Sequence, residues 1–127
     1  MRTLTCLCYL FVLQAVAQQQ PEGFDPPVRP EPIERFRGPV TVRTAAGANR
    51  TVNVAIRTWG IQNRQRITLP ETGFRVVQLI SGDLTTVIAG QRQQRKEGDF
   101  WTVPAGQDLV VETARDTVML SVVSIAP

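Results

Sequence analysis

The chain contains no histidine, and this absence limits the chemistry that its 127 residues could perform. Its two cysteines, Cys6 and Cys8, lie close to the N-terminus. Nucleophilic sites that pair serine or cysteine with a histidine base are therefore excluded, as are metal sites built on imidazole. Asp99 and Glu112 are candidates for acid–base work, but nothing in their spacing places them together. We therefore predict no catalytic residue, no metal ligand and no cofactor.

Arginine side chains offer a second kind of chemistry, the binding of anions. Arg75 belongs to an alternating run that we expect to face the interior of a barrel, where a buried cation needs a partner. We favour an internal ion pair with Glu71 or Glu112. The alternative is an arginine at the base of a pocket, where its two-pronged guanidinium would hold a carboxylate or phosphate together with Arg57 and Arg66.

The tryptophans are the largest side chains that could contact a ligand. At a barrel mouth Trp59 or Trp101 could stack on a sugar or another flat ligand. More often such side chains fill space, and packing is the interpretation that we favour.

The elements that must position these residues are β-strands. From Pro39 onward, alternating or apolar runs are separated by turn residues about every ten positions. The predicted strands are 40–44, 51–59, 64–69, 74–80, 84–89, 100–103, 109–113 and 118–125, and 90–97 is predicted to be a polar loop. About eight short strands without a convincing helix favour a single all-β sandwich or barrel over residues 39–127.

One stretch carries a family resemblance. Gly98, Pro104 and Gly106 form the frame Gly-x5-Pro-x-Gly, and it resembles the second sequence motif of the cupin family. In that motif a metal-binding histidine follows, and the equivalent position here is Leu109. The resemblance covers about residues 60–125 and implies a cupin-type jelly roll, a small β-barrel. It also implies a homodimer, because many small jelly-roll domains pair through their edge strands.

The family's metal-binding positions hold other residue types in this chain. They fall on Leu69 and Glu71 (or Thr68 and Pro70 with the longer spacing), Arg75, Leu109 and Thr113. A transition metal needs imidazole, thiolate or carboxylate groups that converge on one point, and this set offers at most one. The resemblance therefore implies a divergent member of the family, with the architecture but without the metal chemistry.

The N-terminus is typical of an exported protein. A basic start, a short apolar run and Ala15-Val16-Ala17 predict a signal peptide over residues 1–17, cleaved after Ala17. The apolar run is shorter than the roughly 20 residues that span a bilayer, so we expect no retained membrane span. Residues 18–38 are rich in proline and glutamine and are predicted to form a linker or an arm. The mature protein would be periplasmic or secreted.

The charge of the chain is mild. The formal net charge is +3, and basic residues are interleaved with acidic ones. Because nucleic-acid binding needs a concentrated basic face, we expect no nucleic-acid partner.

These observations favour an exported, non-catalytic, cupin-like module that binds a small anionic or sugar-like ligand or a protein partner. The candidate ligand-binding residues are Arg57, Glu71, Arg75, Trp101 and Leu109. Two alternatives stay open: a metal-independent enzyme of the epimerase or lyase type, and a purely structural or regulatory domain. A barrel interior packed shut by Leu69, Val77, Leu79 and Leu109 would favour a structural or partner-binding role, whereas an open pocket lined by Arg75 and a tryptophan would favour ligand binding.

Overall fold

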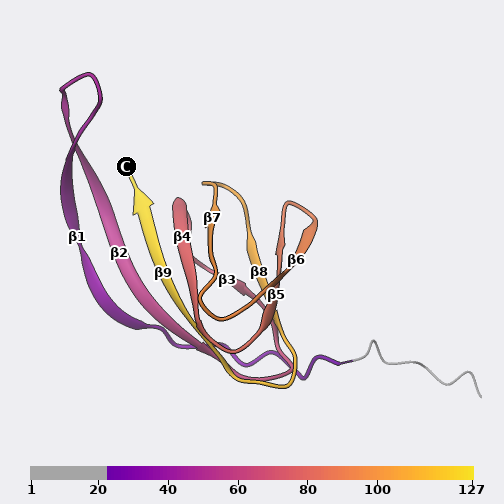
Figure 1. Cartoon of the computed structure of the whole chain (residues 1–127). Helices are drawn as coiled ribbons and strands as arrows, with labels where there is room; N and C mark the ends of the chain where they lie inside the picture. The colour runs from indigo at the N-terminus through magenta and orange to yellow at the C-terminus, as the bar shows by residue number, and fades with distance from the viewer. Residues whose placement is uncertain (1–22) are drawn as a thin grey trace, which may run out of the picture.

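The computed structural model describes residues 23–127, and this part of the chain consists of strands and turns (Figure 1). The predicted signal peptide and both cysteines lie outside the described residues. Within them, no helix is long and apolar enough to cross a membrane. The strands are β1 (Ile33–Arg43), β2 (Asn49–Ile61), β3 (Arg66–Leu69), β4 (Phe74–Ser81), β5 (Leu84–Ile88), β6 (Gln91–Arg95), β7 (Phe100–Val103), β8 (Leu109–Thr113) and β9 (Val118–Ala126).

The strands form two antiparallel sheets. One sheet has the order β1-β2-β9-β4-β7, and the other has the order β3-β8-β5-β6. Strands β2 to β9 thus form two four-stranded sheets in the order of a jelly roll, and β1 adds a fifth strand beside β2. The predicted all-β, jelly-roll architecture is confirmed.

Alternation along the strands builds the core between the two sheets. On β4, Val77 and Leu79 point inward and are fully buried, whereas Val76 and Gln78, which alternate with them, face away. Leu69 on β3 and Leu109 on β8 belong to the same buried hydrophobic cluster. The four side chains that could have left an open barrel are therefore packed together in its interior.

The glycine–proline–glycine frame shapes the turns around β7. Gly98 and Gly106 adopt positive φ angles of 89° and 82°, which glycine reaches without strain. The Gly98 amide donates to the Leu79 carbonyl at 2.8 Å. At the other end, the Gln107 amide donates to the carbonyl of Pro104 at 3.2 Å, directly after β7 ends. The frame is therefore explained by folding alone.

Two strand assignments differ from the sequence prediction. Residues 91–95, predicted as part of a polar loop, form β6, because an edge strand needs only backbone pairing with β5 and no apolar face. The first strand begins at Ile33, inside the segment that was predicted to be a linker or arm. Its first half is exposed and rich in charge, so it carries no alternation signal.

Residues 23–32, which we call the N-terminal arm, lie against the domain. The Asp25 amide donates to the Arg64 carbonyl at 2.7 Å. Buried Gln65 accepts from the Val28 amide at 2.8 Å and donates to the Pro26 carbonyl at 3.3 Å. These contacts fix the path of the arm across the start of β3.

Candidate functional site

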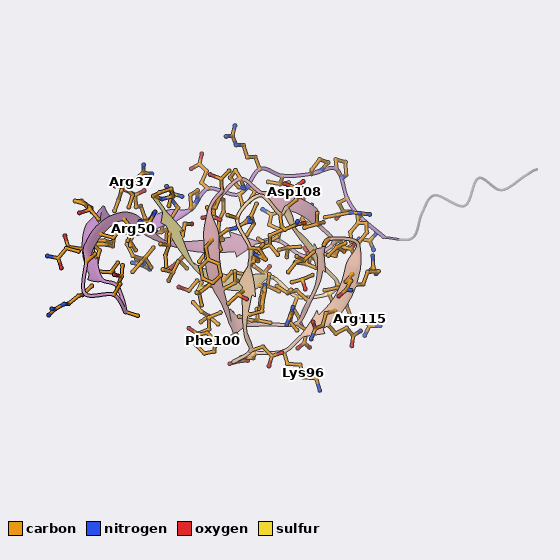
Figure 2. All side chains as sticks on the ribbon, turned by 90° about the horizontal axis from the view of Figure 1, so that it is seen from above. Arg37, Arg50, Lys96, Phe100, Asp108 and Arg115 are labelled. Carbon is orange, nitrogen blue, oxygen red and sulfur yellow. The ribbon has the colours of Figure 1, made fainter. Side chains whose placement is uncertain are left out.

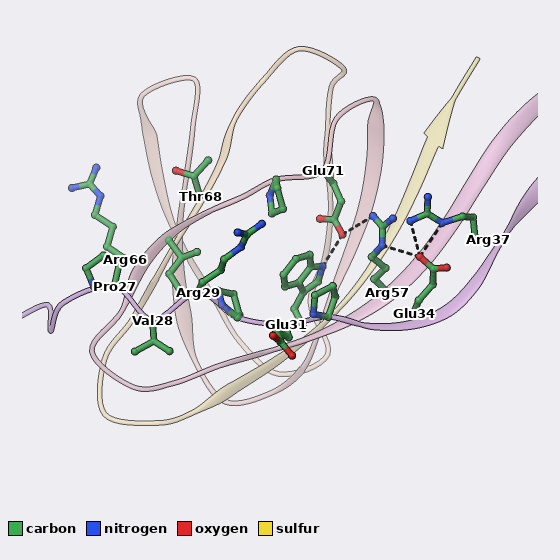
Figure 3. Close-up of a pocket in the computed structure, with 15 residues that line it drawn as sticks. Pro27, Val28, Arg29, Glu31, Glu34, Arg37, Arg57, Arg66, Thr68 and Glu71 are labelled. Carbon is green, nitrogen blue, oxygen red and sulfur yellow. Dashed lines mark hydrogen bonds and ion pairs between the residues drawn. The ribbon is translucent and has the colours of Figure 1, made fainter.

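A groove of about 990 Å³ lies between the N-terminal arm and the edges of strands β2 and β3 (Figure 3). The arm forms one wall, and the other walls come from the first half of β1, from β2, and from β3 with the residues that follow it. Its lining consists of Pro27, Val28, Arg29, Pro30, Glu31, Pro32, Glu34, Arg37, Arg57, Trp59, Arg66, Ile67, Thr68, Pro70 and Glu71.

Strand β2 supplies the central residues of the groove. Its alternation puts Arg57, Trp59 and Ile61 on the side that faces the second sheet. Ile61 and Trp59 enter the core, whereas Arg57 remains half-buried. In the pairing of β1 with β2, Glu34 is directly opposite Arg57. The register therefore brings a carboxylate and a guanidinium together at the groove.

Glu71 supplies the buried carboxylate of the groove. Its Oε1 accepts a hydrogen bond from the indole Nε1–H of buried Trp59 at 2.7 Å and lies 3.7 Å from Nη1 of Arg57. Its Oε2 is buried and has no hydrogen-bond partner within the described residues. Burial raises the pKa of the Glu71 carboxyl, and the Trp59 hydrogen bond and the Arg57 charge oppose this rise. The free oxygen can accept a hydrogen bond from a ligand.

The groove holds more cations than anions. Four arginines and three glutamates line it, and burial favours the neutral form of one of those glutamates, Glu71. Arg37 is paired with Glu34 at 2.8 Å. Arg29 is exposed, points from the arm into the groove in Figure 3, and has no carboxylate within 4.0 Å among residues 23–127. The unpaired positive charge therefore lies where a ligand anion could reach it.

Arg75 is buried next to the groove, and its partners are backbone carbonyls. Its Nη1 donates to the Glu71 carbonyl at 2.8 Å, and its Nη2 donates to the carbonyls of Pro104, at 3.4 Å, and Gln107. The side chain is 1% exposed, and burial lowers the pKa of its guanidinium. Arg75 thus ties the turn after β7 to the segment that carries Glu71.

The favoured ion pair between Arg75 and a glutamate is wrong. In the described part of the chain, no carboxylate oxygen lies within 4.0 Å of Arg75. Glu112 belongs to the other sheet, where its carboxylate accepts from Nη1 of Arg92 at 2.9 Å and lies 3.6 Å from Nε of Arg66. Main-chain carbonyls compensate the buried cation instead.

The remaining candidates lie in the core. Trp101 is 6% exposed and Leu109 is fully buried, and neither lines the groove. The guanidinium carbon of Arg95 lies 4.6 Å from the centroid of the Trp101 ring, in cation–π contact. The structure thus brings Arg57 and Glu71 together in the groove, places Arg75 behind them, and leaves the other two candidates in the packed interior.

Asp99 and Glu112, the two carboxylates considered for acid–base work, are held by different partners. Asp99 Oδ2 accepts from the Lys96 amide at 2.8 Å within a turn. Glu112 is bound by arginines on the other sheet. These two carboxylates each have a structural role in separate places.

The residues at the family's metal-binding positions do not fit the metal site that the cupin resemblance implies. Leu69 and Leu109 are directly opposite each other in the pairing of β3 with β8, so the positions of two family ligands do meet, as aliphatic side chains. Arg75 adds a cation, and only Glu71 offers a carboxylate. Within residues 23–127, no group of three or more aspartate, glutamate, cysteine or histidine side chains could hold a metal ion.

Comparison with solved structures shows which known fold the chain resembles. The chain is similar to a conserved protein of unknown function, SPY1581, from Streptococcus pyogenes, with a TM-score of 0.52 and 20% identity over 76% of this chain and 75% of the other. The cupin domain of Cnp3 from Schizosaccharomyces pombe matches with a TM-score of 0.50 and 10% identity over 71% of this chain and 86% of the other.

An enzyme is also among the similar structures. Salicylate 1,2-dioxygenase from Pseudaminobacter salicylatoxidans matches with a TM-score of 0.51 and 19% identity, over 56% of this chain and 20% of the enzyme. No protein-family model matches the chain, and no curated protein matches it significantly. The fold is therefore of the cupin type. At such low identities the likeness extends to the fold alone, and it does not decide between catalysis and binding.

Proposed function

We propose that this chain is a metal-independent binding module whose groove binds a small hydroxylated anion of the sugar-acid class. The observation that carries the proposal is the buried, unpartnered Oε2 of Glu71 at the groove. Leaving a buried acceptor unsatisfied costs about 1–3 kcal/mol, and more for a charged group. A ligand hydroxyl that donates to this oxygen would recover that cost.

The arginines of the groove support the acidic part of the ligand. Arg29 is free of carboxylates among the described residues, and Arg57 has only long contacts, at 3.4 Å to Glu34 and 3.7 Å to Glu71. A guanidinium binds a carboxylate or phosphate with two parallel hydrogen bonds. A ligand with a hydroxyl at one end and an acidic group at the other would therefore find a partner for each.

The packed interior, which was expected to favour a structural or partner-binding role, leaves no internal ligand pocket, so a ligand site in the described residues would have to lie at the groove. Leu69 and Leu109 fill positions that face the centre of the fold, and both are at most 2% exposed. The groove lies at the rim, where a ligand can enter without displacing the core.

A metal-independent epimerase or lyase is the second candidate function. The raised pKa of Glu71 favours it, because burial makes this carboxyl hold its proton more strongly than an ordinary glutamate, as a general acid must. Such a reaction needs a second acid or base at the substrate. The other carboxylates that line the groove are Glu31 and Glu34, which are exposed, and Glu34 is bound by Arg37. Binding without turnover therefore fits these residues better.

The features of residues 1–17 support a signal peptide, so we propose that the module meets its ligand in the periplasm or outside the cell.

A thermal-shift and calorimetric screen of the metal-free protein in EDTA would test this function. The probes are sugar acids, simple hydroxy acids, neutral sugars and inorganic phosphate. We expect a sugar acid to bind, and Glu71→Gln and Arg29→Ala each to weaken it about tenfold, which corresponds to about 1.4 kcal/mol. Arg115→Ala, in an exposed turn outside the groove, is the matched control. Binding that is indifferent to both groove variants would refute the proposal, and conversion of a probe to product would favour the enzyme.

A further inference from the structure

A second cavity, of about 390 Å³, lies beside the groove at the rim of the packed core. Strands β1, β2 and β9 line one side of it, and the residues 70–72 between β3 and β4 line the other. We call this cavity the second compartment. Ligand pockets commonly measure about 300–1,000 Å³, so the second compartment is large enough to hold one unit of a ligand by itself.

The register of the strands builds the floor of the second compartment. Ser124 on β9 is directly opposite Ala55 on β2, and Ala126 is opposite Asn53. Alternation along β9 puts Ser124 on the same side as buried Val122, which is the side that faces the other sheet. Because two of the floor residues are alanines, their short side chains leave the space above the sheet open.

The hydroxyl of Ser124 is the polar group of this floor. Its Oγ is buried and has no hydrogen-bond partner among residues 23–127. Ser124 is opposite Arg75 in the pairing of β9 with β4, and Nε of Arg75 is also buried without a partner in the described structure. Nearly all buried polar groups of folded proteins have a hydrogen-bond partner. A ligand hydroxyl in the second compartment would provide one for Ser124, which can both donate and accept.

The second compartment continues the groove. Arg37, Arg57 and Glu71 line both spaces. In Figure 3, Arg57 and Arg37 lie at the end of the groove from which β1 and β2 run toward their hairpin. Figure 2 shows Arg37 on the projecting side of the molecule that also carries Arg50. The two spaces therefore meet at Arg57 and Glu71, and a ligand in the groove can extend past this pair toward the hairpin.

We propose that the ligand is an acidic oligosaccharide of two or more sugar units, with its acidic unit in the groove and a neighbouring unit in the second compartment. This inference rests on the proposed function, because it adds a second unit to the same site. The second compartment offers the hydroxyls of Ser124 and Thr72 and the side-chain amide of Asn53. Together these groups can donate to and accept from the hydroxyls of a sugar ring.

The charges of the two spaces determine which unit carries the acidic group. In the second compartment the cations are Arg37 and Arg57, and both contact Glu34, at 2.8 Å and 3.4 Å. Arg29, which has no carboxylate within 4.0 Å in the described part of the chain, lines the groove and not the second compartment. The acidic group therefore belongs in the groove, and the second compartment suits a neutral, hydroxylated ring.

Isothermal titration calorimetry of the protein in EDTA would test the second compartment. The probes are glucuronic acid, a disaccharide of glucuronic acid linked to a neutral sugar, and the neutral disaccharide cellobiose. We expect the acidic disaccharide to bind about tenfold more tightly than glucuronic acid. Ala55→Leu, which fills the floor, and Ser124→Ala, which removes only the hydroxyl and so protects the test against misfolding, should each remove most of this preference. Ser121→Ala, on the opposite side of β9, is the matched control and should keep it.

The ratio of the two affinities separates this inference from the proposed function. Equal affinities for glucuronic acid and the acidic disaccharide would overturn the second compartment and leave the proposed function intact. A preference for the disaccharide that survives both Ser124→Ala and Ala55→Leu would also overturn it. Cellobiose that binds as tightly as the acidic disaccharide would contradict the acidic unit, and binding of none of the three probes would refute both proposals.

Discussion

The indole of Trp59 and the carboxylate of Glu71 are joined by a buried hydrogen bond of 2.7 Å. Trp59 belongs to the hydrophobic core, and Glu71 lines the groove, so this bond joins a groove carboxylate to the core. It occupies Oε1 and leaves the buried Oε2 open. The predictions on stability and binding follow from this arrangement.

The stability of the protein should depend on the charge of Glu71. Burial raises its pKa above the usual 4.5, so the folded state binds a proton more readily than the unfolded state. The carboxyl therefore opposes folding at pH 7, and this cost disappears as the pH falls through its raised pKa toward 4.5. We expect Glu71→Gln to raise the free energy of unfolding, relative to wild type, by more at pH 7 than at pH 4. Denaturant titrations at both pH values measure this difference, and a difference of the opposite sign would contradict the raised pKa.

The two tryptophans should respond differently to loss of their indole N–H. Trp59→Phe removes the donor to Glu71 and should cost about 1–3 kcal/mol beyond the change in packing. Trp101 Nε1 is buried without a partner in the described structure, so Trp101→Phe loses no hydrogen bond. Chemical denaturation of both variants provides the comparison. A smaller loss of unfolding free energy for Trp59→Phe than for Trp101→Phe would show that the Trp59–Glu71 hydrogen bond contributes little to stability.

Arg75 should be essential for stability because its buried guanidinium binds three backbone carbonyls in the segments that follow β3 and β7. Arg75→Met keeps much of the side-chain length but leaves the carbonyls of Glu71, Pro104 and Gln107 without their donor. We expect the free energy of unfolding to fall by about 3 kcal/mol or more, since hydrogen bonds to charged groups contribute about 1.5–3 kcal/mol each. Arg115→Ala, at an exposed position, should stay within about 0.5 kcal/mol of wild type. Equal melting curves for the two variants would refute this role of Arg75.

Export should remove the first 17 residues. We expect N-terminal sequencing or intact mass spectrometry of protein recovered from the periplasm or medium to give Gln18 as the first residue. Ala17→Arg should block cleavage, because signal cleavage sites need small residues. Retention of Met1 in wild-type material from the cytoplasm alone would contradict the signal peptide.

The sequence predicts the strands well where one side is buried. Strands 100–103 and 109–113 have the bounds of β7 and β8, because buried Val103 and Leu109 mark their inward face. Strand β6 escapes prediction because Gln91–Arg95 is entirely polar and gains its structure from pairing with β5. Apolar and polar residues alternate along a strand only where one side of the strand is buried, so an exposed edge strand lacks this pattern.

The candidate site was only partly accessible from the sequence. Arg57 and Glu71 were identified, but Arg29 and Glu34 were not. Arg29 reaches the groove only because the arm docks through Gln65, a contact between residues more than thirty positions apart. Glu34 meets Arg57 through the register of β1, next to an irregularity in its pairing. Such placements follow from tertiary packing, which local patterns do not encode.

The most direct test of the central claim is a crystal structure of the metal-free protein with the sugar acid that binds it best. We predict that the ligand occupies the groove, with a hydroxyl within hydrogen-bond distance of Glu71 Oε2 and its acidic group on the guanidinium of Arg29 or Arg57. A ligand held elsewhere, or a transition metal bound tightly by the purified protein, would contradict the account.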